Sequence, residues 1–252
     1  MLKKRLIGVI TVKDGWAVQS FGYQRYLPVG RPEVLAENLD RWGADEILIQ
    51  CIDRNRSGPD LALLERVASA QLSTPLIYGG GIASVSDAVD AVRAGADRIC
   101  IDALLHDYPA EAARLGEPLG AQAIIAVLPL SSGGGWFDYR TRQTQAIGRS
   151  AESVLRSGAI SELLVVDHAH EGGPDAFDAN LLDHAAFGPP LIAFGGIGAP
   201  AQVAALLARE TVAAVGIGTF LNYREHALQA YRAAIDDAPL RAPSYDQPLA
   251  IA

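Results

Sequence analysis

Two pairs of apolar stretches decide the fold of this chain. The first pair is Asp45-Glu46-Ile47-Leu48-Ile49 and, further on, Pro75-Leu76-Ile77-Tyr78-Gly79-Gly80-Gly81. The second pair is Glu162-Leu163-Leu164-Val165-Val166 and Pro190-Leu191-Ile192-Ala193-Phe194-Gly195-Gly196, at a nearly constant offset from the first. Continuous apolar runs bounded by turn residues are typical of strands that are buried on both faces. Two similar halves, with strands that end in glycine, predict a barrel built by duplication.

Apolar runs of this kind alternate with alanine-rich amphipathic stretches along the whole chain. Eight runs are found, at about residues 6–12, 46–52, 75–79, 97–102, 122–128, 162–168, 190–195 and 212–218. The amphipathic stretches between them include residues 32–42, 61–70, 85–94 and 199–208. Alternating strands and helices favour βαβ units and a parallel sheet.

We therefore predict an α/β fold, a single (β/α)8 TIM barrel with an internal half-barrel duplication. The barrel domain would span residues 1–252, with halves at about 1–118 and 119–235 and a C-terminal tail at 236–252 that covers the surface. A doubly wound open sheet is the alternative, but the half-chain repeat and the even number of strands favour closure.

Composition limits the classes of function. The chain has 252 residues and a net charge of −8, which argues against binding to nucleic acid, because such proteins normally present a basic face. The two cysteines, Cys51 and Cys100, lie in apolar runs and indicate reduced thiols of a cytoplasmic protein. Lys3-Lys4-Arg5 and the following apolar run resemble the start of a signal peptide, but we interpret them as a first strand. No run approaches the roughly 18 apolar residues of a membrane span.

Two connections are longer than the others, and both follow the carboxyl end of a strand. The first runs from Gly15 to Gly30, and the second runs from Pro129 to Thr144 and contains the stretch Ser131 to Arg140, SSGGGWFDYR. Both would lie over the mouth of the barrel. A glycine run beside aromatic residues predicts a lid, and a solvent-exposed hairpin is an equally weighted alternative.

Glycines follow several of the predicted strands and precede helices. Glycine lets backbone N–H groups approach an anion closely, and the next helix N-terminus adds its dipole. The predicted phosphate-binding residues are Gly80, Gly81, Gly172, Gly196, Gly218 and Thr219. The alternative is that these glycines only permit tight turns, but two symmetric glycine turns favour phosphate.

Charged residues stand at the opposite ends of four strands. Arg5, Glu46, Arg98 and Glu162 each begin an apolar run and would project around the N-terminal face of the barrel. Two cations and two carboxylates can neutralise one another as a ring. Taken alone, the pattern is also explained by ordinary salt bridges that close the bottom of the barrel.

Polar groups at the other strand ends are candidates for acid–base chemistry. Asp53 follows the second strand, Asp102 ends the fourth, and His170 follows the sixth in Asp167-His168-Ala169-His170. His170 fits a general acid–base or anion-binding role, although a hydrogen-bonded loop histidine is the simpler interpretation. No third ligand has the spacing of a zinc site, so neither a metal nor a cofactor is predicted.

The chain resembles the cyclase subunit of imidazole glycerol phosphate synthase from residue 1 to about residue 235. The resemblance rests on Lys4-Arg5-Leu6-Ile7, Val12-Lys13-Asp14-Gly15, Tyr78-Gly79-Gly80-Gly81-Ile82, Gly95-Ala96-Asp97-Arg98 and Thr219-Phe220-Leu221-Asn222. It implies that a glutaminase subunit docks at the N-terminal face of the barrel. It also implies that ammonia enters through a charged gate and crosses the core to the mouth. The family's gate residues correspond to Arg5, Glu46, Arg98 and Glu162, with arginine for lysine at residue 98.

The chain departs from that family at the positions of the family's catalytic aspartates. Thr11 and Pro129 stand where the resemblance implies the two catalytic aspartates, and Cys51 replaces a third aspartate. Asp102-Ala103 replaces the Asn-Thr pair of one phosphate site, and a carboxylate there would repel phosphate. Thr11, Asp53, Asp102 and His170 are therefore the candidate catalytic residues, and the resemblance implies that the second phosphate site, at Gly172, Gly196, Gly218 and Thr219, is retained.

A chain that keeps the gate residues but lacks the catalytic aspartates resembles the amidation-associated paralogues of the cyclase. The main hypothesis is an ammonia-channelling subunit of a glutamine-dependent system that converts an acetamido to an acetamidino group on a sugar, in surface-polysaccharide biosynthesis. Its partners would be a glutaminase, an ATP-dependent amidating enzyme, and a phosphorylated small molecule or nucleotide sugar. The first alternative is a histidine-pathway cyclase with altered acid–base residues, and the second is a non-catalytic activator or scaffold for a glutaminase.

Overall fold

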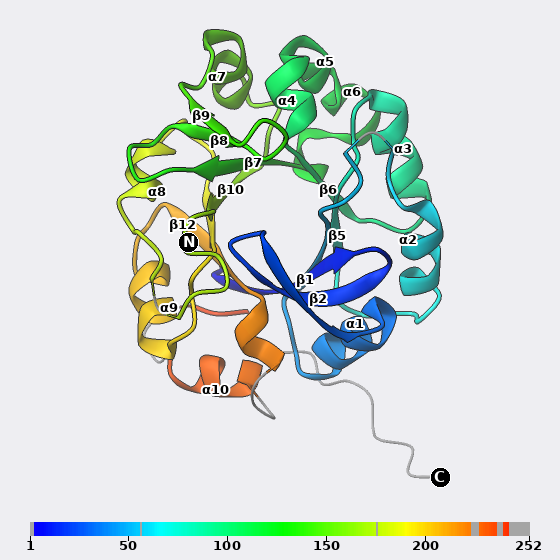
Figure 1. Ribbon diagram of the computed structural model, residues 1–252, viewed down its shortest axis with the longest axis vertical. Helices are drawn as coiled ribbons and strands as arrows, with labels where there is room; N and C mark the ends of the chain where they lie inside the picture. Colours follow the sequence, from blue (N-terminus) through cyan, green and yellow to red (C-terminus); the bar gives the residue numbers. More distant parts are fainter. Residues whose placement is uncertain (1–2, 56, 175, 223–226, 236–238, 242–252) are drawn as a thin grey trace.

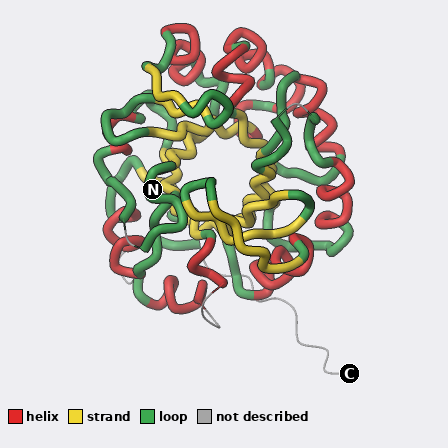
Figure 2. The backbone as a smooth tube through the Cα atoms, viewed as in Figure 1, coloured by secondary structure: helices red, strands yellow, loops and turns green. Residues whose placement is uncertain are grey.

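The computed structural model describes residues 3–55, 57–174, 176–222, 227–235 and 239–241. Within these residues, eight parallel strands close into a barrel because the last strand in the order, β7, also pairs with the first, β10. Figure 2 shows the ring of strands inside an outer layer of helices. The barrel strands are β1 (Arg5–Lys13), β4 (Glu46–Cys51), β5 (Leu76–Gly79), β6 (Arg98–Ile101), β7 (Ile124–Leu130), β10 (Glu162–Asp167), β11 (Leu191–Phe194) and β12 (Val212–Ile217). The predicted closed (β/α)8 barrel is confirmed.

Helices follow the strands and cover the outside of the barrel (Figure 1). The α-helices are α1 (Pro32–Arg41), α2 (Leu61–Ala68), α3 (Val85–Arg93), α4 (Ala103–Asp107), α5 (Pro109–Arg114), α6 (Gly116–Leu119), α7 (Arg149–Arg156), α8 (Leu181–His184), α9 (Pro200–Leu207) and α10 (Ala227–Ala233). Two 3₁₀ turns are η1 (Ala121–Ala123) and η2 (Thr219–Asn222). Local sequence defines the helix starts: Asp60 and Ser84 accept N-terminal backbone hydrogen bonds, and Pro32 and Pro200 occupy first turns.

Side chains alternate between the two faces of each barrel strand. The inward-facing apolar residues form one cluster, which we call the barrel interior: Ile7, Val9, Leu48, Ile77, Cys100, Ile125, Val127, Leu164, Val166, Ile192, Phe194 and Ala214. The outward-facing residues form a larger cluster with the helices, in which Leu6, Ile10, Ile47 and Ile49 are almost completely buried. Both faces of every barrel strand are therefore buried, which explains the continuous apolar runs in the sequence.

Two β-hairpins extend from the carboxyl ends of barrel strands. The first, β2 (Trp16–Phe21) and β3 (Arg25–Gly30), pairs antiparallel with the end of β1. The second, β8 (Trp136–Asp138) and β9 (Gln143–Gln145), pairs with the end of β7. Both lie over the same end of the barrel (Figure 1). They occupy the two long connections, and Trp136 is 2% exposed, so the second hairpin is packed on the barrel and is not simply solvent-exposed.

The predicted tail at 236–252 falls mostly outside the described residues. The described part, 239–241, runs beside the start of β1, where the Lys4 amide donates to the Pro239 carbonyl over 3.0 Å and the Arg241 amide to the Lys4 carbonyl over 3.2 Å. Among the described residues, no helix is long and apolar enough to cross a membrane.

Candidate functional site

The four charged residues at the strand N-termini meet in a closed ring, which we call the charged ring. Arg5 Nη1 lies 3.1 Å from Glu46 Oε2, and the other Nη of Arg5 pairs with Glu162. Arg98 Nη1 lies 3.0 Å from Glu46 Oε1, and its Nη2 lies 2.6 Å from Glu162 Oε2. Each arginine therefore bridges both carboxylates. The four side chains are only 6–18% exposed.

Strand alternation explains why these four side chains converge. The residues two positions further along each strand are Ile7, Leu48, Cys100 and Leu164, and all four belong to the barrel interior. Residues two apart on a strand share a face, so Arg5, Glu46, Arg98 and Glu162 also point inward. The charged ring is thus the bottom layer of the barrel.

The ring is held by further contacts of Arg98. Its Nε donates to the Gln122 carbonyl over 3.1 Å, and its Nη2 donates to Ser161 Oγ over 2.9 Å. Burial alone would lower the pKa of Arg98, but the nearby Glu162 and Glu46 carboxylates raise it above its usual value. Glu46 Oε2 and Glu162 Oε2 each lie at ion-pair distance from a guanidinium without meeting hydrogen-bond geometry among the described residues.

A cavity of about 320 Å³ opens at the other end of the barrel, and we call it the mouth cavity. Its base is formed by Leu48, Cys100, Val127 and Leu164 of the barrel interior. Along β4, β6 and β10 these base residues follow directly after ring residues on the inward face. On that side of the barrel, a single layer of apolar side chains separates the charged ring from the mouth cavity.

Two carboxylates, Asp102 and Asp138, line this cavity, and of these Asp102 stands at the end of a barrel strand. It follows Cys100 on the inward face and precedes α4, but its side chain does not cap that helix. Burial raises the pKa of Asp102 to about 7, although Arg140 and His106 act in the opposite direction and Trp136 donates a hydrogen bond to it. A carboxyl group with this pKa exchanges a proton near neutral pH, which suits it to acid–base chemistry.

Side chains from both hairpins partly cover the cavity from above. Tyr23, at the tip of the first hairpin, packs on the barrel interior and donates from its hydroxyl to Gln50 Oε1 over 3.3 Å. Its ring meets Tyr139 of the second hairpin edge-on, with 5.0 Å between centroids. Glu171 fixes the first hairpin, because its carboxylate accepts from Ser20 Oγ over 2.9 Å and from the Tyr23 amide over 3.2 Å. The two hairpins thus meet above the cavity and cover part of it.

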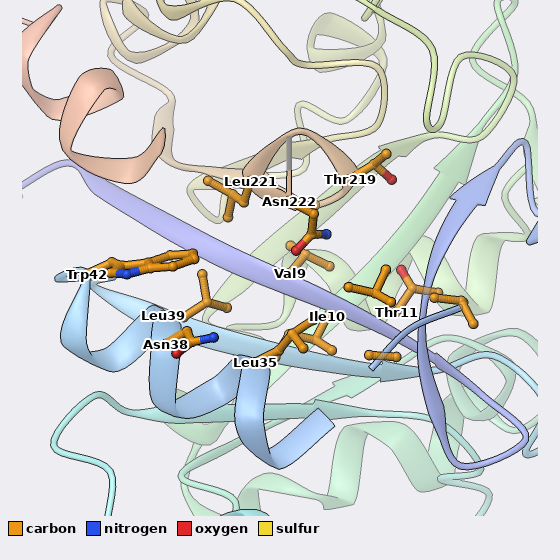
Figure 3. A pocket seen from close by; sticks show the side chains of 14 residues that line it. Val9, Ile10, Thr11, Leu35, Asn38, Leu39, Trp42, Thr219, Leu221 and Asn222 are labelled. Atoms are coloured by element: carbon orange, nitrogen blue, oxygen red, sulfur yellow. The ribbon is translucent and has the colours of Figure 1, made fainter. Parts of the chain in front are cut away.

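The structure separates Thr11 from Asp102. Thr11 is 6% exposed and stands beside Gln50 in the β1–β4 register, but it does not line the mouth cavity. It borders a second cavity of about 370 Å³ between β1, α1 and η2, together with Asn38, Trp42 and Asn222 (Figure 3). Pro129 is buried in β7.

Asp53 and His170 also lie outside the lining of the mouth cavity. Asp53 accepts a hydrogen bond from the Asp14 amide over 2.5 Å and so fixes the turn that follows β1. His170 Nδ1 lies 2.7 Å from Asp167 Oδ2, and its side chain is 45% exposed. Asp167 itself is 2% exposed and also accepts from the Asp178 amide over 2.8 Å. Only Asp102 of the four candidate catalytic residues therefore lines the mouth cavity.

The predicted phosphate-binding residues fall into three groups. Gly80 and Gly81 line the mouth cavity, Gly218 and Thr219 line the second cavity, and Gly172 and Gly196 line neither. Close approach of neighbouring backbone accounts for glycine at some of these positions. Gly172 has φ +75°, and a Cβ there would overlap the Ser20 carbonyl oxygen of the first hairpin.

Sequence reasoning did not single out several polar residues that line the mouth cavity, among them Tyr23, Tyr26, Gln50, His106 and Arg142. The glycine-rich stretch that ends in Tyr139-Arg140 did mark the second hairpin as a cover. Nothing in the sequence marks Gln50, because it is a single polar residue within an apolar run. Among the described residues, no three His, Cys, Asp or Glu side chains group closely enough to hold a metal ion.

The fold and this geometry define a (β/α)8 barrel with a charged ring at one end and, at the other, a partly covered cavity that has an apolar base and polar groups in its wall. Residues 5–227 match the family model described as histidine biosynthesis protein, so the chain belongs to that family.

The curated relatives agree with this assignment. The chain is 32% identical over 207 residues to "Imidazole glycerol phosphate synthase subunit HisF" of Exiguobacterium sibiricum, covering 79% of this chain and 82% of the relative. It is 30% identical over 246 residues to the HisF subunit of Hyphomonas neptunium, covering 94% and 97%. It is 29% identical over 244 residues to the HisF subunit of Geobacillus thermodenitrificans, covering 92% and 96%. The protein is thus a HisF-like barrel.

Proposed function

We propose that this chain is the ammonia-accepting subunit of a glutamine-dependent synthase, with a glutaminase subunit bound at the N-terminal face of the barrel. The observation that carries the proposal is the closed ring of Arg5, Glu46, Arg98 and Glu162 directly below the barrel interior. The relatives named as HisF subunits of imidazole glycerol phosphate synthase support the same conclusion.

The charged ring suits the entry of ammonia. Its two cations and two carboxylates balance, and Glu46 Oε2 and Glu162 Oε2 have capacity to accept an N–H hydrogen bond. The layer above the ring is apolar, and burial raises the pKa of the Cys100 thiol to about 12, so this thiol is neutral at physiological pH. Transfer of ammonium into such a layer is costly, whereas neutral ammonia crosses it more readily. Entry would require one ion pair of the ring to open.

Ammonia that crosses this layer would arrive at the base of the mouth cavity, where the reaction would take place. The first candidate reaction is cyclisation of the ribonucleotide substrate of imidazole glycerol phosphate synthase. The names of the relatives favour it. Asp102, with its pKa raised to about 7 by burial, would then serve as the carboxyl group that exchanges protons with the substrate.

The second candidate reaction is transfer of ammonia to a sugar derivative, together with an ATP-dependent amidating enzyme. Thr11 and Pro129 favour it, because neither side chain replaces the aspartates that the family resemblance implies at these positions. A threonine hydroxyl is a poor acid or base near neutral pH, and proline has no side-chain proton to exchange.

The test combines this protein with the glutaminase subunit from its own organism and the ribonucleotide, and supplies either glutamine or ammonium. Consumption of the ribonucleotide with both nitrogen sources would establish the cyclase reaction. Stimulated glutamine hydrolysis without ribonucleotide consumption would exclude the cyclase reaction and favour transfer of ammonia to a sugar derivative. Failure of the folded barrel to associate with the glutaminase or to stimulate it would contradict the proposed function.

A further inference from the structure

The mouth cavity has an uneven distribution of polar groups. Near its base, the wall carries the Asp102 carboxyl group and the Gln50 amide. Further out stand the guanidinium groups of Arg54, in the loop after β4, and Arg142, in the second hairpin. A ligand that fills the cavity would therefore meet hydrogen-bonding groups near the base and cationic groups further out.

Among the described residues, the two basic side chains that face Asp102 in the cavity, His106 and Arg140, are both engaged by other groups. His106 Nδ1 lies 2.6 Å from Asp107 Oδ1, and Arg140 of the second hairpin is paired with two carboxylates other than Asp102. Arg140 Nη2 lies 2.8 Å from Asp107 Oδ1, and its Nε lies 3.0 Å from Asp138 Oδ1. A phosphate placed beside Asp102 would thus meet a carboxyl group without a compensating charge, and like charges at short distance repel strongly where water is limited.

Further out the cavity differs, because Arg142 is not engaged by a carboxylate among the residues that the structure describes. Arg54 donates to the backbone carbonyls of Ser57 and Gly58 over 3.1 and 3.0 Å, which fixes its position. Arg142 is exposed, lines the cavity, and forms no ion pair with any of the residues that the structure describes. A guanidinium in this state is a ready partner for a phosphate or carboxylate.

Aromatic side chains provide the remaining surface of the cavity. Tyr23, Tyr26, Trp136 and Tyr139 all line it. Burial raises the pKa of both Tyr23 and Tyr139 well above the usual value, so both phenols remain neutral. Flat aromatic faces together with carboxyl and amide groups match a ligand whose ring has C–H faces and hydroxyl edges.

We infer that the mouth cavity binds a hydroxylated ring with one anionic substituent, with the hydroxyls at Asp102 and Gln50 and the anion at Arg142. The volume of about 320 Å³ suits a single sugar-sized ring. The inference rests on the proposed function, because it concerns the substrate of the same site, and it favours the second candidate reaction, in which the acceptor is a sugar derivative. It makes Gln50, Asp102 and Arg142 specificity-determining residues.

The test measures binding of glucose, glucose 6-phosphate and glucose 1,6-bisphosphate by titration calorimetry at pH 8. These probes share one ring and differ only in the number of phosphates. We expect glucose 6-phosphate to bind about tenfold more tightly than either of the other two, the equivalent of one favourable charge contact. Equal or tighter binding of the bisphosphate, or no binding of the monophosphate, would overturn the inference.

Two variants assign the effect to the named residues. Asp102→Asn should strengthen bisphosphate binding about tenfold and leave monophosphate binding within about threefold. Arg142→Ala should weaken monophosphate binding about tenfold without changing glucose binding, and this exposed residue can be replaced without disturbing the core. Arg93→Ala, in α3 with a 77% exposed side chain, removes the same charge on the outside of the barrel and should change nothing. Parallel effects of Arg93→Ala and Arg142→Ala would contradict the assignment.

Glutaminase association, measured on the same preparations, separates the two claims. If the protein prefers the bisphosphate but still binds the glutaminase, only the inference about the substrate class is wrong. If the protein prefers the monophosphate but does not bind the glutaminase, only the proposed ammonia-accepting function is wrong.

Discussion

Asp102 shows how the position of one residue decides its chemistry. Its carboxyl group faces the mouth cavity, and its charged surroundings come from three elements: His106 in α4, Asp138 in β8, and Arg140 after β8. The sequence predicts a carboxylate at the end of a strand. It does not predict the burial that raises the pKa to about 7, because that burial depends on Trp136 and the second hairpin.

A stability measurement tests this pKa. The folded-state pKa of Asp102 lies above its unfolded value, so the folded state binds the extra proton between about pH 4 and pH 7, and stability falls as the pH rises through that window. Asp102→Asn removes this loss. The unfolding free energy of the variant minus that of the original protein should therefore increase by on the order of 2 kcal/mol from pH 5 to pH 8. Urea denaturation at both pH values provides the measurement.

His106, Asp138 and Arg140 also face Asp102, but all three are shared by both proteins. Their effects therefore cancel in the difference. A difference in stability that is the same at pH 5 and pH 8 would show that Asp102 has an ordinary pKa.

At the scale of elements, the barrel strands and several helices are predictable, whereas the individual strands of the two hairpins are not. The barrel strands are buried on both faces, so each leaves a continuous apolar run, and the predicted runs agree with the observed strands to within one or two residues at most ends. The exposed hairpin strand β9, Gln143–Gln145, leaves no such pattern. Its position depends on tertiary contacts, such as the edge-on packing of Tyr23 against Tyr139.

The contact of the first hairpin with the loop after β10 gives an element-scale prediction. Gly172→Ala introduces a Cβ at φ +75° that would overlap the Ser20 carbonyl oxygen, so the hairpin must shift. We expect a loss of about 2–4 kcal/mol in unfolding free energy, with faster proteolysis of residues 15–30. Limited proteolysis and urea denaturation measure the two effects.

Two other glycines serve as matched controls for this substitution. Gly15 has φ +78° with open space around its Cβ position, so Gly15→Ala isolates the backbone strain and should cost about 1 kcal/mol. Gly133 has neither a positive φ nor a neighbour within 4 Å, and Gly133→Ala should change stability by less than about 0.5 kcal/mol. Similar losses at all three positions would show that the hairpin contact has no special role.

At the scale of the whole molecule, the charged ring and the mouth cavity stand at opposite ends of one barrel. The four ring residues were predictable, because each begins an apolar run and closure brings such positions together. Which polar residues share the mouth cavity was not predictable, because it depends on the stagger of the strands: Asp102 and Gln50 line the cavity, whereas Thr11, next to Gln50 in register, does not.

The stability of the ring gives the prediction at this scale. Glu46→Gln leaves two largely buried arginines with one carboxylate, and we expect a loss of about 2–4 kcal/mol in unfolding free energy. Glu152→Gln removes a carboxylate from the exposed Glu152–Arg156 pair of α7 and should cost less than about 0.5 kcal/mol. Equal losses in urea denaturation for the two variants would show that the ring is no more than an ordinary surface network.

The central claim is that the ring end of the barrel receives a glutaminase, and sedimentation velocity of the barrel mixed with the glutaminase subunit from the same organism tests it most directly. We predict one faster-sedimenting complex for the original protein and for Arg93→Ala, and loss or weakening of that complex for Arg5→Glu at the ring. Independent sedimentation of the two original proteins at all concentrations would contradict the account.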